Sequence, residues 1–134
     1  MTRPDRSDDD DFYEQGFNRD GFVSVWAGKT DPRLEPEIDV LQELCGVGYY
    51  RLSDQEGNNL DFEEVPLQAL LKDISYSKSF MGNVRRAAEK MGLFQARWVV
   101  LQYEFHYDPT KVTRQIADDP IFIGAFPFTT EDEK

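Results

Sequence analysis

The sequence predicts a single α+β domain in which a mainly antiparallel sheet carries helices packed on one face. Three apolar runs typical of strands occupy residues 22–27, 97–105 and 120–128. Between the first two runs, apolar side chains are spaced as they are in helices. The resulting order of strand, helix, hairpin, two helices and two strands fits a sheet covered on one side. A chain of 134 residues is long enough for one such domain.

The first expected strand, FVSVWA at residues 22–27, ends at a glycine. A helix is expected to begin near Pro36, because proline fits the first helical turn. The carboxylates of Glu37 and Asp39 would favour the positive end of its dipole. Its apolar face would carry Ile38, Leu41, Leu44 and Cys45. The GVG segment at residues 46–48 would end this helix.

A hairpin and a short helix are expected next. Residues 49–53 and 59–63 alternate in polarity as strands do, and residues 54–58 between them have turn-forming side chains. These three segments therefore predict a hairpin. Pro66 then opens a short helix with three apolar side chains, Leu67, Leu70 and Leu71.

A further helix is expected to follow a serine-rich segment, where the hydroxyl of Ser77 or Ser79 would cap its first turn. Gly92 would end this helix. Its apolar positions fit a period of 3.6 residues; they are Phe80, Val84, Ala87, Ala88 and Met91.

Residues 97–105 give the clearest strand pattern in the chain. One phase of the alternation is wholly apolar, which predicts a central strand; it comprises Val99, Leu101, Tyr103 and Phe105. Residues 120–128 predict the last strand. Pro127 has no N–H to donate to a ladder, so it is expected either on an edge of the sheet or past the paired part of the strand. Trp26 and Trp98 lie in strand patterns and are expected in the core.

The chain divides into three expected parts. Residues 1–21 form a polar, acidic arm that we expect to be mobile, with Phe12, Tyr13 and Phe17 as side chains able to dock on the body. Residues 22–128 form the α+β body. Residues 129–134 form an acidic tail.

Composition favours a soluble cytoplasmic protein. The chain carries a formal net charge of −11, has one cysteine, and shows neither a signal-peptide pattern nor an apolar run of membrane-spanning length. A single cysteine cannot form an internal disulfide, which favours a reducing compartment. The acidity disfavours binding to nucleic acid or to anionic lipid, because phosphate contacts need a basic surface.

The sequence offers little catalytic chemistry. His106 is the only histidine, so a site with two histidine ligands is excluded. Its neighbour Glu104 would allow an acid–base pair, but the end of an exposed strand face explains both residues better. Cys45 lies on the apolar side of its helix, where it is expected to act as a small hydrophobe. Residues 54–61 lack the spacing of a calcium loop. No catalytic residue, metal site or cofactor is therefore expected.

The charges are unevenly distributed along the chain. Residues 34–71 contain nine acidic residues and one basic residue, Arg51. Residues 72–97 are mainly basic, and most of this basic stretch belongs to one expected helix. A concentrated acidic face suits fast association with a basic partner, although solubility alone also explains acidity.

Four segments taken together resemble the immunity protein 22 family of bacterial polymorphic toxin systems. In order, these are FVSVWAG at residues 22–28, DISYSKSF at 73–80, WVVLQYEFHYD at 98–108 and FIGAFPF at 122–128. The resemblance spans nearly all of the expected body. It implies a small cytoplasmic α+β protein that binds a toxin domain and has no enzymatic activity. Residues matching the family are interpreted as structural; they include Trp26, Ser75, Tyr76, Ser77 and Phe80.

The expected partner is the C-terminal domain of a cognate toxin, with a basic surface and with nuclease activity as one possibility. The hypothesis for the binding face combines the acidic stretch with three aromatic side chains. Its residues are Glu35, Glu37, Asp39, Glu43, Tyr49, Tyr50, Asp54, Glu56, Asp61, Phe62, Glu63 and Glu64. Two alternatives stay open. One is a small metal-dependent hydrolase that uses Asp54, Glu56 and Asp61, and the other is an acidic adaptor protein.

Overall fold

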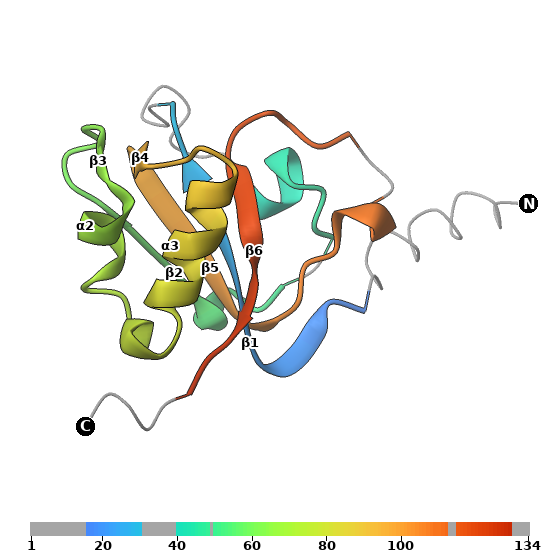
Figure 1. Ribbon diagram of the computed structural model, residues 1–134. Coiled ribbons are helices and arrows are strands. Elements are labelled where there is room, and N and C mark those ends of the chain that lie inside the picture. Colours follow the sequence, from blue (N-terminus) through green and yellow to red (C-terminus); the bar gives the residue numbers. More distant parts are fainter. Residues whose placement is uncertain (1–15, 31–39, 49, 113–114, 130–134) are drawn as a thin grey trace, which may run out of the picture.

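The computed structural model describes residues 16–30, 40–48, 50–112 and 115–129 (Figure 1). Four antiparallel strands form the main sheet in the order β2-β5-β1-β6. Their bounds are Asn18–Gly28 for β1, Gln55–Asn59 for β2, Trp98–Phe105 for β5 and Ile121–Pro127 for β6. A second, two-stranded sheet pairs β3, Val65–Pro66, with β4, Gln95–Ala96. The expected α+β class with an antiparallel sheet is confirmed.

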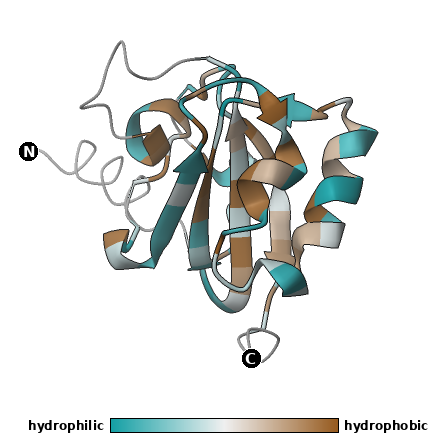
Figure 2. Cartoon of the chain, turned by 90° about the vertical axis from the view of Figure 1, so that its left-hand side faces the viewer, coloured by the Kyte–Doolittle hydropathy of each residue, from teal (hydrophilic) through white to brown (hydrophobic). Residues whose placement is uncertain are grey.

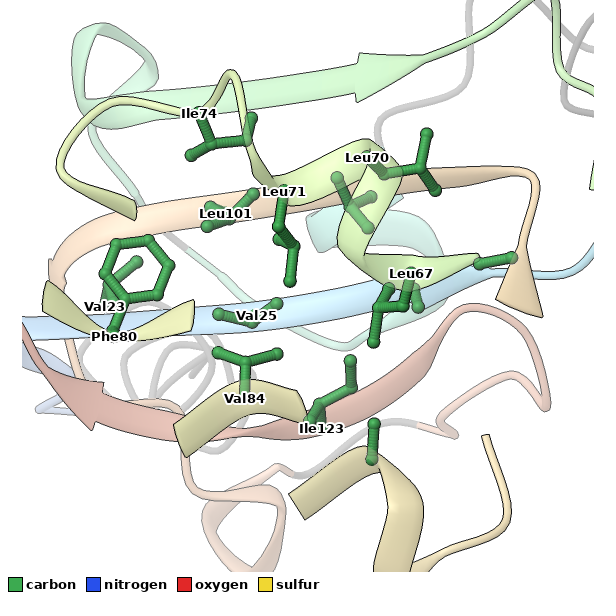
Figure 3. Packing of buried hydrophobic residues seen from close by; sticks show 14 of the residues in the cluster. Val23, Val25, Leu67, Leu70, Leu71, Ile74, Phe80, Val84, Leu101 and Ile123 are labelled. Atoms are coloured by element: carbon green, nitrogen blue, oxygen red, sulfur yellow. The ribbon is translucent and has the colours of Figure 1, made fainter. Parts of the chain in front are cut away.

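The two α-helices of the described residues, α2 (Leu67–Leu71) and α3 (Met81–Lys90), pack on the same face of the main sheet. Figure 3 shows Leu67, Leu70 and Leu71 of α2 directed at the apolar side chains of the strands. Burial of this face forms the larger of two hydrophobic clusters. Within it the strands contribute Val23, Val25, Ala27, Val99, Leu101, Tyr103 and Ile123.

In the described part of the chain, a π-helical turn and irregular segments cover the opposite face of the sheet. Leu41, from the π-helical turn η2 (Val40–Leu44), and the fully buried Val47 pack there. Three aromatic rings from different elements meet beneath them: Trp26 and Tyr107 lie 5.0 Å apart between centroids, and Tyr107 and Phe122 lie 4.7 Å apart. The sheet therefore lies between two separate apolar layers.

The expected positions of β5 and β6 are confirmed. β5 lies between β2 and β1 in the sheet, and β6 lies at an edge, as the proline at position 127 requires. Trp26 and Trp98 are both buried. β1 begins at Asn18 rather than at residue 22, and Phe17 before it is buried. Phe12 and Tyr13 lie outside the described residues.

The predicted hairpin is wrong. Residues 55–58 of the predicted turn, together with Asn59, form the edge strand β2 and pair with β5. The chain turns later, at Asp61 and Phe62, whose φ angles of 57° and 56° are left-handed. An edge strand with one neighbour tolerates polar side chains, and Figure 2 shows β2 as mainly hydrophilic beside more hydrophobic inner strands. The alternating pattern used for the prediction therefore missed it.

The apolar phase predicted for β5 is wrong at its last residue. Glu104 has a left-handed φ of 55°, and the register with β1 shifts beside it. Such a bulge turns the following side chain to the other face of the sheet. Tyr103 consequently packs in the cluster under the helices, while Phe105 packs in the opposite one.

The helix predictions are confirmed in part. Pro66 precedes α2, and its three predicted leucines are buried. Phe80, Val84 and Ala88 of the third predicted helix are buried, whereas Met91 is exposed. The predicted serine cap is wrong, because residues 77–79 form a separate 3₁₀ turn, η4, and α3 has no side-chain cap. Of the helix predicted from Pro36, the start lies outside the described residues.

None of the described helices is both long enough and apolar enough to cross a bilayer.

Candidate protein-binding surface

The structure places part of the predicted binding face and leaves part of it undescribed. Glu35, Glu37, Asp39 and Tyr49 lie outside the described residues. The remaining predicted residues lie on three different parts of the molecule: on η2, on the chain before, along and after β2, and beside the small β3–β4 sheet.

The acids of the described part differ in their surroundings. Glu43 is exposed on η2, whose Leu41 packs in the cluster that contains Trp26. Asp61 and Glu63 are exposed in the turn after β2. The Oε2 atom of Glu64 accepts a hydrogen bond from the Nζ atom of Lys29 at 2.9 Å. This bond and the lysine charge lower the pKa of Glu64 below its ordinary value.

The two described aromatic residues of the predicted face contribute to the core. Tyr50 and Phe62 are half-buried and pack against the cluster that contains Trp26. The carbonyl oxygen of Phe62 also accepts a hydrogen bond from Arg97 at 2.9 Å. Both rings therefore have structural contacts, which leaves them less surface for a partner.

A surface hollow of about 310 Å³ collects other residues beside β2. The strand β2, the turn before it, the loop after α2, the end of β5 and the chain after β6 all contribute to its walls. The lining residues are Ser53, Asp54, Gln55, Glu56, Ser75, Tyr76, Tyr103, Glu104 and Phe128. Of the predicted face, only Asp54 and Glu56 line it.

Two lining residues form hydrogen bonds with the backbone of Ser75. The hydroxyl of Tyr103 donates a hydrogen bond to the Ser75 carbonyl oxygen at 2.6 Å. The Oε2 atom of Glu56 accepts one from the Ser75 N–H at 3.2 Å. Because the donor and the acceptor come from β5 and β2, the loop after α2 is tied to two neighbouring strands.

The bulge in β5 directs Glu104 toward the same hollow. Its Oε1 atom accepts a hydrogen bond from the Gly21 N–H at 2.7 Å. Ser24 supports the bulge from β1: its Oγ atom donates to the Phe105 carbonyl oxygen at 2.8 Å and accepts from the Tyr107 N–H at 2.9 Å. The position of Glu104 is thus set by a buried hydroxyl on the adjacent strand.

Three aromatic rings form the apolar part of the hollow. Tyr76 packs edge-on against Tyr103, with 6.0 Å between ring centroids, and stacks with Phe128 at 5.9 Å. Tyr103 and Phe128 meet edge-to-face at 5.1 Å. Tyr76 and Phe128 are only half-buried, so their rings remain accessible from solvent.

The hollow carries negative charge. Among the described residues, its lining includes three carboxylates and no lysine, arginine or histidine. Arg51 reaches Asp54 from outside, with 3.6 Å between Nη1 and Oδ2, but its own side chain is 66% exposed. A second hollow of about 200 Å³ between α2 and α3 has one acid and one base, Glu89 and Arg85. The excess of acid thus distinguishes the hollow beside β2.

The described residues give little geometric support to the hydrolase hypothesis or to chemistry at His106 or Cys45. Asp61 does not line the hollow with Asp54 and Glu56, so the carboxylate trio of the hydrolase hypothesis is not assembled. Among the residues described, no group of three or more metal-ligating side chains is suitably placed. The ring of His106 packs against Phe22 at 5.1 Å, and Cys45 is buried.

Sequence reasoning missed Tyr76, Tyr103, Glu104 and Phe128 as candidate site residues. It interpreted Tyr76 as structural and Tyr103 as core, and both have such contacts. The four residues come together only through the strand order and the bulge. The one local signal was the polar residue Glu104 in an otherwise apolar strand.

Comparison with protein-family models, curated proteins and solved structures finds no match to this chain.

Proposed function

We propose that this chain is an immunity protein, which binds the C-terminal domain of a cognate antibacterial toxin and neutralises it by forming an equimolar complex. It acts in the cytoplasm of the producing cell and catalyses no reaction. The observation that carries the proposal is the concave surface beside β2, where three carboxylates lie next to three aromatic rings.

Carboxylates beside accessible aromatic rings suit protein recognition. Aromatic side chains supply contact area at the centre of interfaces, and the charges around them select a partner of opposite sign. The hollow beside β2 has both features on elements held by the Tyr103–Ser75 and Glu56–Ser75 hydrogen bonds. A preformed surface loses less conformational entropy when it binds.

The charge of the chain supports a basic partner. The formal net charge of −11 creates a field that attracts cationic proteins and raises their association rate. A toxin that cleaves nucleic acid needs a basic cleft for phosphates, and an acidic protein can occupy such a cleft in place of the phosphates. A nuclease domain is therefore the partner class that the charge favours.

The order of the four segments supports the same function. FVSVWAG and WVVLQYEFHYD cover most of β1 and β5, which pair in the centre of the sheet. DISYSKSF contributes Ser75 and Tyr76 to the hollow, and FIGAFPF ends at Phe128 in its wall. The segments that resemble the immunity protein family thus include five residues of the candidate surface, because β5 adds Tyr103 and Glu104 to the three from the other segments.

The test is protection of cells from the toxin domain encoded beside this gene. Bacteria expressing that domain should survive when they also express this chain, and the two proteins should co-purify. The double variant Asp54→Lys/Glu56→Lys should lose protection. The matched variant Glu89→Lys/Asp118→Lys makes the same change in charge at exposed positions outside the hollow and should retain protection.

A neighbouring reading frame that encodes no toxin, or a toxin domain that kills cells despite this chain, would refute the proposal. Loss of protection by both double variants would point to net charge as the cause and would remove the hollow from the interface.

A further inference from the structure

We infer that the hollow beside β2 binds the side chain of an arginine from the partner protein, and that this arginine anchors the complex. The inference rests on the proposed function for its biological setting, but it concerns a chemical preference that the isolated protein must also show. Its basis is the arrangement of the carboxylates and the rings.

The three carboxylates that line the hollow come from different elements. Asp54 lies in the turn η3 (Leu52–Asp54), Glu56 lies in β2, and Glu104 lies at the bulge of β5. Within the described chain, the bond from Ser75 engages one oxygen of Glu56, and the bond from Gly21 engages one oxygen of Glu104. Each of these two carboxylates therefore keeps an oxygen that can accept a hydrogen bond from a ligand.

The rings complete a site for a planar cation. Tyr76 and Phe128 stack with each other at the hollow and are half-buried, so each offers part of its ring to a ligand. A guanidinium group packs flat against an aromatic face and gains a cation–π interaction there. The ring and the carboxylates are within one hollow of about 310 Å³, which has room for a side chain.

Arginine fits this arrangement better than lysine does. The guanidinium group has five N–H donors in a fixed plane and can bond two carboxylates while one face stacks on a ring. The lysine ammonium is a compact, strongly hydrated charge with three donors. Acceptors supplied from β2 and β5 beside aromatic rings therefore select the planar cation.

The test measures binding of capped tripeptides by NMR. The peptide glycine–arginine–glycine, acetylated and amidated at its ends, is titrated into the isotopically labelled protein. Saturable shifts are expected at the amides of Gln55, Ser75 and Tyr103. The same peptide with citrulline in place of arginine keeps the shape and loses the charge. It should bind at least about tenfold more weakly, because hydrogen bonds to charged groups are the stronger ones.

A variant pair locates the site. Asp54→Asn/Glu56→Gln removes two negative charges and keeps an oxygen acceptor for the Ser75 N–H. This variant should bind the arginine peptide at least about tenfold more weakly. Glu89→Gln/Asp118→Asn removes the same charge at exposed positions outside the hollow and should leave the affinity within about twofold.

Equal affinity for the arginine and citrulline peptides would overturn the inference. Equal affinity for the same capped tripeptide with lysine in place of arginine would also overturn it. Shifts spread over other acidic residues would also overturn it. The comparison of peptides needs only the unmodified protein, so it decides the matter even if a variant does not fold. If the protein protects cells but does not bind the arginine peptide, only this inference is refuted. If it binds the peptide but no toxin domain, the proposed function is refuted instead.

Discussion

The hydroxyl of Tyr103 donates a hydrogen bond to the carbonyl oxygen of Ser75 over 2.6 Å and so ties the central strand β5 to the loop after α2. Tyr103 is buried, with its ring between Phe80 and Phe128. The bond spans 28 positions in sequence and fixes one wall of the acidic hollow.

Replacing Tyr103 by phenylalanine removes this bond and keeps the ring. The free energy of unfolding should fall by about 1 kcal/mol, because the Ser75 carbonyl oxygen loses its donor. Urea denaturation followed by circular dichroism measures the change. Tyr76→Phe is the matched control: it alters a half-buried tyrosine in the same hollow and should change the free energy by less than about 0.5 kcal/mol. Equal losses in the two variants would show that the bond from Tyr103 contributes no stability.

Ser24→Ala should lower the free energy of unfolding by more than the loss of an exposed hydroxyl does. The Oγ atom of Ser24 is buried and bonds both the Phe105 carbonyl oxygen and the Tyr107 N–H beside the bulge. Without it, two buried backbone groups lose their partner, so the protein should be destabilised by about 2 kcal/mol. The same urea experiment on Ser53→Ala, an exposed position, should show a change below about 0.5 kcal/mol. A Ser24→Ala protein as stable as the Ser53→Ala protein would contradict the role assigned to this hydroxyl.

Two glycines should respond to alanine with opposite signs. A Cβ atom on Gly28 would lie 1.9 Å from the Trp98 ring, whose indole N–H donates to the Thr30 carbonyl oxygen. Gly28→Ala should therefore destabilise the protein by about 1–3 kcal/mol and shift the tryptophan fluorescence. In α3, a Cβ atom on Gly82 would meet only the guanidinium of Arg86, at 3.6 Å. Gly82→Ala should stabilise the protein by about 0.5–1 kcal/mol.

Thermal unfolding of both variants checks this pair. A Gly28→Ala protein that melts no lower than the wild type would mean that Trp98 leaves its position at little cost. A Gly82→Ala protein that melts lower would mean that α3 does not accept the additional methyl group.

The carboxyl group of Asp108 should titrate below its ordinary pKa of 3.8. The Thr110 hydroxyl donates to its Oδ1 atom at 2.6 Å, and the Thr110 N–H donates to the same atom at 3.0 Å. Both bonds favour the charged carboxylate and lower its pKa. The stabilisation is therefore complete above the unfolded pKa of the aspartate and is lost as the pH falls through the lower folded value.

Thr110→Val removes the hydroxyl donor and should raise the pKa of Asp108 toward 3.8, as followed by carbon NMR of the side-chain carboxyl group. Lys111→Gln serves as the comparison, because the charge of Lys111 contributes less to the lowering than the two bonds do. Its pKa shift should be smaller and in the same direction. A larger shift in Lys111→Gln would mean that charge, rather than hydrogen bonding, holds this carboxylate ionised.

The sequence predicted those parts of the fold in which burial follows the local pattern. The alternation of apolar side chains in residues 98–103 placed β5 in the centre of the sheet, and Pro127 placed β6 at an edge. The apolar–polar alternation did not predict β2, because this strand lies at an edge of the sheet with one neighbour and its side chains are polar. The alternation also failed at Glu104, because its left-handed φ angle turns the side chain of Phe105 to the other face of the sheet.

The candidate surface was predictable only in part. The acidic stretch contributed Asp54 and Glu56, which are close in sequence and both line the hollow. Its other lining residues include Tyr76, Glu104 and Phe128, which lie far along the chain and meet through strand pairing. No periodicity or charge pattern links residues so distant in sequence.

The rate of association with the toxin domain encoded beside the gene tests the proposed inhibition most directly. Stopped-flow mixing should give an equimolar complex whose association slows as salt is added, because opposite charges steer the encounter. Asp54→Lys/Glu56→Lys should bind at least about tenfold more slowly, and Glu89→Lys/Asp118→Lys should stay within about threefold of the unmodified protein. The absence of a complex, or an association rate that neither salt nor the first pair of substitutions changes, would contradict inhibition through the acidic hollow beside β2.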